Sequence, residues 1–183
     1  MATTMKSAPA PAPAHDVFPI NGTDYIEFWV GNAKQAAHFY RSAFGFQLVA
    51  YRGPETGVRD RASYLLQQDK IRFVLTTAIR PDLSPEAKEI ADHVHKHGDG
   101  VRDLALWVED ARDAFSKAVE RGAKPVHEPR VMKDKDGEIV VAAFRTYGDT
   151  IHSLVERMNY RGIFMPGYVP MKAYFNPAPA GLK

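Results

Sequence analysis

Three closely spaced histidines are the first group of residues in this sequence that could do chemistry. They are His93, His95 and His97 in the segment HVHKH. Histidines at positions i and i+4 of a helix share a face and can bind Zn²⁺, as in the HExxH pattern. The glutamate base of that pattern is missing here, and residues 98–100 (GDG) end the helix directly afterwards. Because histidines near a helix C-terminus interact favourably with the helix dipole, we interpret the run as a helix end, with Zn²⁺ as the alternative.

Other catalytic patterns are missing from the 183 residues. There is no cysteine, which excludes disulfides, thiolate metal ligands and cysteine nucleophiles. No Gly-x-Ser-x-Gly elbow and no glycine-rich phosphate loop follows a predicted strand. The segment Gly53–Gly57 has two glycines, but no predicted helix follows it, so we interpret it as a turn.

The charge pattern excludes several classes of partner. The chain has 24 Lys and Arg against 22 Asp and Glu, a net charge of +2, with both signs mixed along the sequence. Nucleic-acid and anionic-membrane binding need basic residues gathered on one face, so we expect neither partner. The sequence shows no signal peptide and no apolar stretch of transmembrane length. The lack of cysteine suits a reducing compartment, and we expect a cytoplasmic protein.

Both ends of the chain have the composition of irregular segments. Alternating Ala and Pro predicts a disordered, extended arm over residues 1–20. Residues 166–183 also contain four prolines, but they include several large apolar side chains: Tyr168, Val169, Met171, Tyr174 and Phe175. We therefore expect the C-terminal segment to lie against another part of the protein or to link to a further domain.

The chemistry-bearing residues lie within an internal repeat. YIEFWVGNAKQA, which starts at Tyr25, matches DLALWVEDARDA, which starts at Asp103, 78 positions further on. A later segment that starts at Asp69 matches one that starts at Asp149, 80 positions further on. Two matches in the same order and at nearly the same offset indicate a duplicated structural unit.

The sequence of each copy predicts one strand, one helix and three further strands. Asn32 and Asp110 occupy N-cap positions, and Gly45 and Gly122 follow the helices where a left-handed residue is favoured. Hydrophobic spacing predicts the following elements: strands 25–30, 47–52, 61–67 and 70–77 around helix 33–43, and strands 104–108, 124–130, 139–146 and 151–157 around helix 111–121. A connecting helix is predicted over 83–97. The sequence therefore predicts an α+β domain over residues 21–165, built from βαβββ units at about 23–78 and 101–158.

A tandem βαβββ pair is the arrangement of the vicinal oxygen chelate superfamily, which includes glyoxalase and bleomycin-resistance proteins. Four segments resemble the N-terminal half of 4-hydroxyphenylpyruvate dioxygenase: the one that starts YIEFWVGNAKQAAHFY, then HGDGVRDLALWVEDA, TYGDTIHSLVER and NYRGIFMPGY. The resemblance covers about residues 24–168. Hydroxymandelate synthase shares this architecture and the same substrate, and its equivalent half is an alternative.

The resemblance implies that the catalytic iron lies outside this chain. In that family a second βαβββ pair holds Fe(II) through two His and one Glu. The enzyme converts 4-hydroxyphenylpyruvate, a 2-oxo acid, and O₂ to homogentisate and CO₂ in tyrosine catabolism. We therefore expect the isolated chain to carry no catalytic residue, to bind no cofactor and to be inactive. The expected partners are the catalytic domain or another subunit, in a homo-oligomer, with residues 166–183 as the linker.

In the superfamily, metal ligands project from the first and last strands of each unit into a cup. The repeat places Tyr25 and Asp103 at the first position, and Thr76 and Glu156 at the second. Of these only the two carboxylates are ordinary ligands, whereas Fe(II) sites of this type use two His and a carboxylate. We therefore expect no metal in the cup, but a packed or ion-paired interior with Arg102 or Arg157 near a carboxylate. The alternative is a free-standing glyoxalase-like binding or metalloenzyme domain, which would need these four residues as ligands.

Overall fold

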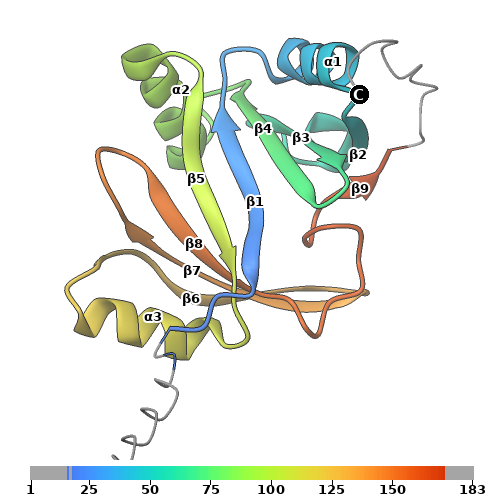
Figure 1. Cartoon of the computed structure of the whole chain (residues 1–183). Coiled ribbons are helices and arrows are strands. Elements are labelled where there is room, and N and C mark those ends of the chain that lie inside the picture. Colours follow the sequence, from blue (N-terminus) through green and yellow to red (C-terminus); the bar gives the residue numbers. More distant parts are fainter. Residues whose placement is uncertain (1–15, 17, 172–183) are drawn as a thin grey trace, which may run out of the picture.

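Two βαβββ units form one continuous mixed sheet in the computed structural model, which describes residue 16 and residues 18–171 (Figure 1). The first unit contains β1 (Gly22–Trp29), α1 (Ala33–Phe44), β2 (Gln47–Arg52), β3 (Arg61–Gln68) and β4 (Ile71–Ala78). The second contains β5 (Gly100–Trp107), α3 (Ala111–Glu120), β6 (Lys124–Asp134), β7 (Gly137–Arg145) and β8 (Ile151–Glu156). Helix α2 (Pro85–His97) connects them, and the short strand β9 (Val169–Pro170) follows.

The strand order reflects the duplication. It runs β6-β7-β8-β5-β1-β4-β3-β2-β9, so the two units meet at the antiparallel pair β1 and β5 in the middle of the sheet. In each unit the first strand pairs in parallel with the last, β1 with β4 and β5 with β8. The α+β fold of tandem βαβββ units is thereby confirmed. The largest shifts of boundary are in β5, which starts at Gly100, and β6, which extends to Asp134.

Local sequence explains where the helices begin and end. The Asn32 side chain accepts a hydrogen bond from the Gln35 amide at 3.0 Å, and Asp110 accepts from the amides of Arg112 and Asp113 at 2.9 Å. These contacts satisfy amides that have no partner within the helix. Gly45 ends α1 with φ 76°, a left-handed conformation that glycine adopts without steric cost. None of the helices in the described part of the chain is long and apolar enough to cross a membrane.

Apolar clusters lie on both faces of the sheet. On its outer face α1 and α3 each cover an apolar cluster, centred on Leu66 and Leu75 under α1 and on Phe115 and Leu154 under α3. The inner, concave face carries a third cluster that both units share. It contains Tyr25, Ala50, Leu65, Val74, Ala105, Ile139, Val141, Val155, Phe164 and Met165.

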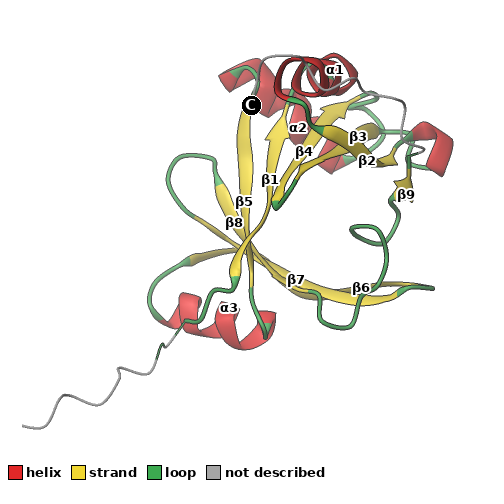
Figure 2. Cartoon of the chain, turned by 45° about the vertical axis from the view of Figure 1, so that its right-hand side comes forward, coloured by secondary structure: helices red, strands yellow, loops and turns green. Residues whose placement is uncertain are grey.

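The segment from Arg157 to Met171, here called the strap, covers this inner face. It leaves β8, passes the β6–β7 side of the sheet and ends as β9 beside β2, as Figure 2 shows. Phe164 and Met165 enter the inner core, with exposed fractions of 2% and 8%, and the Met171 amide donates to Val49 O at 2.9 Å. The strap therefore fills the cup with the protein's own side chains. Tyr174, Phe175 and most of the predicted N-terminal arm lie outside the described residues.

Candidate functional site

Two of the predicted cup residues, Tyr25 and Asp103, meet on the inner face. The Tyr25 hydroxyl donates to Asp103 Oδ2 at 3.0 Å, and the Ser153 hydroxyl donates to the same oxygen at 2.6 Å. The Ser153 amide donates to Asp103 Oδ1 at 2.9 Å. Burial raises the pKa of the Asp103 carboxyl, while these hydrogen bonds act in the opposite direction. Both carboxylate oxygens are therefore engaged within the protein.

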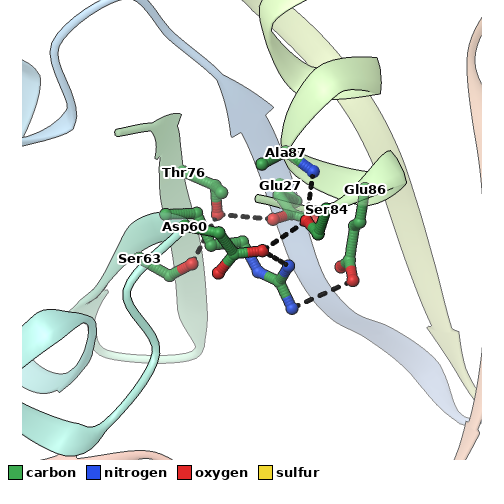
Figure 3. Close-up of polar contacts among 8 residues, drawn as sticks. Glu27, Asp60, Ser63, Thr76, Ser84, Glu86 and Ala87 are labelled. Atoms are coloured by element: carbon green, nitrogen blue, oxygen red, sulfur yellow. Dashed lines mark hydrogen bonds and ion pairs between the residues drawn. The ribbon is translucent and has the colours of Figure 1, made fainter. Parts of the chain in front are cut away.

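The third predicted residue, Thr76, belongs to a neighbouring polar group. Its hydroxyl donates to Glu27 Oε1 at 2.6 Å and lies 2.9 Å from the Ser63 hydroxyl, as Figure 3 shows. Glu27 is partly buried on β1, opposite Asp103 of β5. Burial is the main reason that the pKa of Glu27 rises to about 7; the Thr76 hydrogen bond opposes this rise and the charge of Asp103 adds to it.

The fourth predicted residue, Glu156, does not face the cup, and this expectation was wrong. Glu156 is paired with Val140, which packs under α3, and its Oε2 accepts a hydrogen bond from the Ala111 amide at 3.1 Å. The structural counterpart of Thr76 is Val155, because Thr76 is aligned with Trp29 and Val155 with Trp107. The alignment of the two sequence repeats placed the counterpart of Thr76 one residue too far along the chain, at Glu156. A slip of one residue in a strand transfers a side chain to the opposite face.

Arg157 pairs with a buried carboxylate and Arg102 with an exposed one, but neither carboxylate belongs to the predicted cup residues. Arg157 makes a two-pronged ion pair with Asp24, from Nε to Oδ2 at 2.5 Å and from Nη2 to Oδ1 at 2.6 Å. Arg102 donates to Glu89 at 2.7 Å and lies over the Trp29 ring, 4.6 Å from its centroid. Both arginines thus stabilise the packing around the sheet.

The histidine run lies at the end of α2, where it contacts the β7–β8 turn. His97 Nε2 is 2.8 Å from Asp149 Oδ2, and the same oxygen accepts from Lys96 Nζ at 2.7 Å. The His93 ring packs edge-on against Trp29, and burial, His97 and Arg102 lower the pKa of His93. Within the described residues, no three His, Asp or Glu side chains are grouped so that they could hold a metal ion. The Zn²⁺ alternative therefore gains no support from the geometry.

The inner face does not fit Fe(II). The oxygen-bearing side chains that line its cavity are Tyr25, Glu27, Ser63, Thr76, Glu86 and Tyr168, and no histidine is among the described lining residues. Asp103 and Ser153 lie beside them, hydrogen-bonded to each other. Phe164 of the strap packs edge-on against Tyr25, with ring centroids 5.5 Å apart. The two-His-one-carboxylate set of such Fe(II) sites is missing from this lining.

The polar residues that sequence reasoning missed lie mainly in the first unit. They include Glu27, Ser63 and Arg61, which pairs with Asp60 and Glu86 at 2.9 Å each (Figure 3). Strict alternation along β1 would have placed Glu27 on the same face as Tyr25. The inner face carries a partly open cavity of about 100 Å³. Typical small-molecule sites measure ~300–1,000 Å³, so this cavity admits only very small molecules.

Changing Glu27 to Gln is expected to remove a pH dependence of stability. The folded-state pKa of Glu27, about 7, lies above its usual value of 4.5, so the folded protein binds more protons between these values. Stability is therefore lost as pH rises from 4.5 to 7. Between pH 5 and pH 8, wild type should lose about 2 kcal/mol more unfolding free energy than the variant. Denaturant unfolding at both pH values measures this, with Glu128→Gln on the exposed edge strand as the control. Equal pH profiles for wild type and Glu27→Gln would contradict it.

Comparison with known proteins agrees with this geometry. The fold and the cupped inner face define a domain of the glyoxalase and vicinal oxygen chelate class. Methylmalonyl-CoA epimerase from Mycobacterium tuberculosis has the same fold, with a TM-score of 0.60 and 19% identity over 80% of this chain and 93% of that one. The family model described as "Hydroxyphenylpyruvate dioxygenase, HPPD, N-terminal" matches residues 15–165. The chain belongs to this family of N-terminal domains.

Individual relatives show the same relationship. The chain is 50% identical over 145 residues to 4-hydroxyphenylpyruvate dioxygenase of Danio rerio, and 44% identical over 161 residues to that of Yarrowia lipolytica. A mutant of 4-hydroxymandelate synthase from Streptomyces coelicolor matches with a TM-score of 0.71 and 30% identity over 89% of this chain. These matches cover 36%, 41% and 44% of the respective relatives. The chain thus spans less than half the length of each.

Proposed function

We propose that this chain is the structural, N-terminal half of a 4-hydroxyphenylpyruvate dioxygenase. In that role it supports a separate iron-bearing half that converts 4-hydroxyphenylpyruvate and O₂ to homogentisate and CO₂. The observation that carries the proposal is the inner face. Its carboxylates are engaged by hydroxyl donors, and the strap fills the cup where superfamily members hold their metal. The chemistry then belongs to the remaining length of the full enzyme.

The surface supports a role in assembly. Helix α1 exposes Phe39 and Phe44, at 55% and 48%, and Ile71 at the start of β4 is 50% exposed. Phe39 and Phe44 contact each other, with ring centroids 5.6 Å apart. Large apolar side chains that are exposed and contact one another are typical of surfaces that bind another domain or subunit. The catalytic half and a second copy of the protein, in a homo-oligomer, are the proposed partners.

Two other functions fit less well. The equivalent half of a hydroxymandelate synthase has the same architecture, and the TM-score of 0.71 to that enzyme favours it as the second candidate. A free-standing glyoxalase-like metalloenzyme would need Tyr25, Thr76, Asp103 and Glu156 as ligands. Glu156 lies on the other face of the sheet, at the start of α3, which argues against that alternative.

The test compares the isolated chain with a fusion. The chain is joined to the part of the Danio rerio relative that follows the matched segment, and both proteins are loaded anaerobically with Fe(II). Oxygen uptake with 4-hydroxyphenylpyruvate is expected from the fusion and not from the isolated chain. Chromatography of the product distinguishes homogentisate from hydroxymandelate. Turnover by the isolated chain would overturn the proposal.

A further inference from the structure

The cavity under the strap has an unusual lining. Its polar side chains come from four strands, α2 and the strap: Tyr25 and Glu27 of β1, Arg52 of β2, Arg61 and Ser63 of β3, Thr76 of β4, Glu86 of α2 and Tyr168 of the strap. The cavity measures about 100 Å³. A water molecule occupies ~30 Å³ of liquid, so the space corresponds to about three waters.

Two arginine donors beside this cavity have no acceptor. Nε of Arg52 and Nε of Arg61 are buried and make no hydrogen bond within the described residues. Buried donors in folded proteins almost always have an acceptor, either in the protein or in ordered water. An acceptor inside the cavity would satisfy both.

The two arginines differ in how their charge is balanced. The terminal nitrogens of Arg61 pair with Asp60 and Glu86. Arg52 forms no ion pair among residues 18–171; its guanidinium instead lies 5.3 Å from the centre of the Tyr168 ring. Arg52 thus makes no direct ion pair within the described residues, although its charge reaches Glu27 and Asp60, where it favours the ionised carboxylates. Its unpaired Nε donor can still bind an anion, because charge-assisted hydrogen bonds to arginine are strong.

We propose that this cavity binds a small carboxylate of the size of formate or acetate. The Nε groups of Arg52 and Arg61 donate to its oxygens. Ser63 and Thr76 line the cavity from the sheet, with their hydroxyls bonded to each other and that of Thr76 also to Glu27. The volume excludes aromatic carboxylates. Burial raises the pKa of Glu27 to about 7, so below that pH its carboxyl is mostly neutral and does not repel the anion. The other carboxylate in the lining, Glu86, is paired with Arg61. This site is independent of the proposed catalytic role of the full enzyme.

Binding would also hold the strap in place. Tyr168 both lines the cavity and stacks on Arg52, and three residues further on Met171 pairs with Val49. An anion that orders the Arg52 guanidinium therefore fixes the platform on which Tyr168 rests. The amides of residues 168 and 171 should exchange with solvent more slowly when the anion is bound.

The experiment titrates sodium formate and sodium acetate into the 183-residue chain at pH 6 and constant ionic strength. Fluorescence of Trp29, which lines the cavity, reports binding. Saturable binding is expected, and Arg52→Met should weaken it roughly tenfold or more because a charged hydrogen-bond donor is removed. Arg80→Met is the matched control: Arg80 is 58% exposed and pairs only with exposed Asp82 in the described structure. Its affinity should equal that of wild type.

Two further arms keep the test decisive if Arg52→Met does not fold. Arg52→Lys keeps the charge but lacks Nε, and it should bind with intermediate affinity. Benzoate should not bind to wild type, because the cavity is too small for its ring. The proposal is overturned if wild type shows no saturable binding, if Arg52→Lys binds as tightly as wild type, or if benzoate binds as well as acetate.

Discussion

Replacing Phe164 by alanine is expected to lower the free energy of unfolding by about 3–5 kcal/mol. The Phe164 ring is 2% exposed and lies between Tyr25 and Tyr168, with ring centroids 5.5 and 5.0 Å away. Removing the ring leaves a void in the core that both units share. A loss of this size is a large part of the ~5–15 kcal/mol that stabilises a typical domain. Denaturant unfolding monitored by circular dichroism measures it.

The matched control is the neighbouring residue in the strap. Ile163 is 45% exposed, so Ile163→Ala should change the unfolding free energy by only about 0.5 kcal/mol. Phe164→Leu keeps most of the buried volume and should fall between the two. If Phe164→Ala is no more destabilising than Ile163→Ala, the strap does not fill the cup and the inner face is not closed.

Replacing Asp24 by alanine is expected to cost a similar amount, about 3–5 kcal/mol. The Asp24 side chain is 2% exposed and accepts two hydrogen bonds from Arg157, whose side chain is 16% exposed. Without Asp24 the arginine keeps the Phe164 carbonyl, at 2.7 Å, but loses its nearest counter-charge. The pair joins the first strand of the first unit to the start of the strap, so its loss should loosen both.

A surface ion pair provides the comparison. Asp82→Ala removes the partner of Arg80, and both side chains are more than half exposed, so it should cost less than about 1 kcal/mol. A double-mutant cycle combines Asp24→Asn with Arg157→Met. The double variant removes both charges and should be less destabilising than the sum of Asp24→Asn alone and Arg157→Met alone. Additive losses in this cycle would show that Asp24 and Arg157 do not stabilise the fold as a pair.

The duplicated fold was predictable from sequence because each unit repeats the same local signals. The caps at Asn32 and Asp110 and the strand patterns around Trp29 and Trp107 recur in the same order, and the structure places them in equivalent elements. These features depend on contacts within a few residues. They can therefore be recognised in the sequence.

The inner face was harder to predict because it depends on register and on distant contacts. The offset of 80 that aligned Asp69 with Asp149 does not hold in the following strands, where the pairing of Thr76 with Trp29 and of Val155 with Trp107 gives 79. The contact between Asp24 and Arg157 joins residues 133 positions apart, and no local sequence pattern predicts it. The strap contains irregular chain, so its packing on the cup follows from the shape of the sheet and not from periodicity.

The iron content of the isolated chain shows whether the inner face can hold a metal. The chain is incubated anaerobically with Fe(II), desalted and analysed for iron, and its oxygen uptake with 4-hydroxyphenylpyruvate is then measured. Phe164 closes the cup, and its carboxylates are engaged by Tyr25, Ser153 and Thr76. We therefore expect far less than one iron per chain and no oxygen uptake. One iron per chain together with turnover would contradict this expectation.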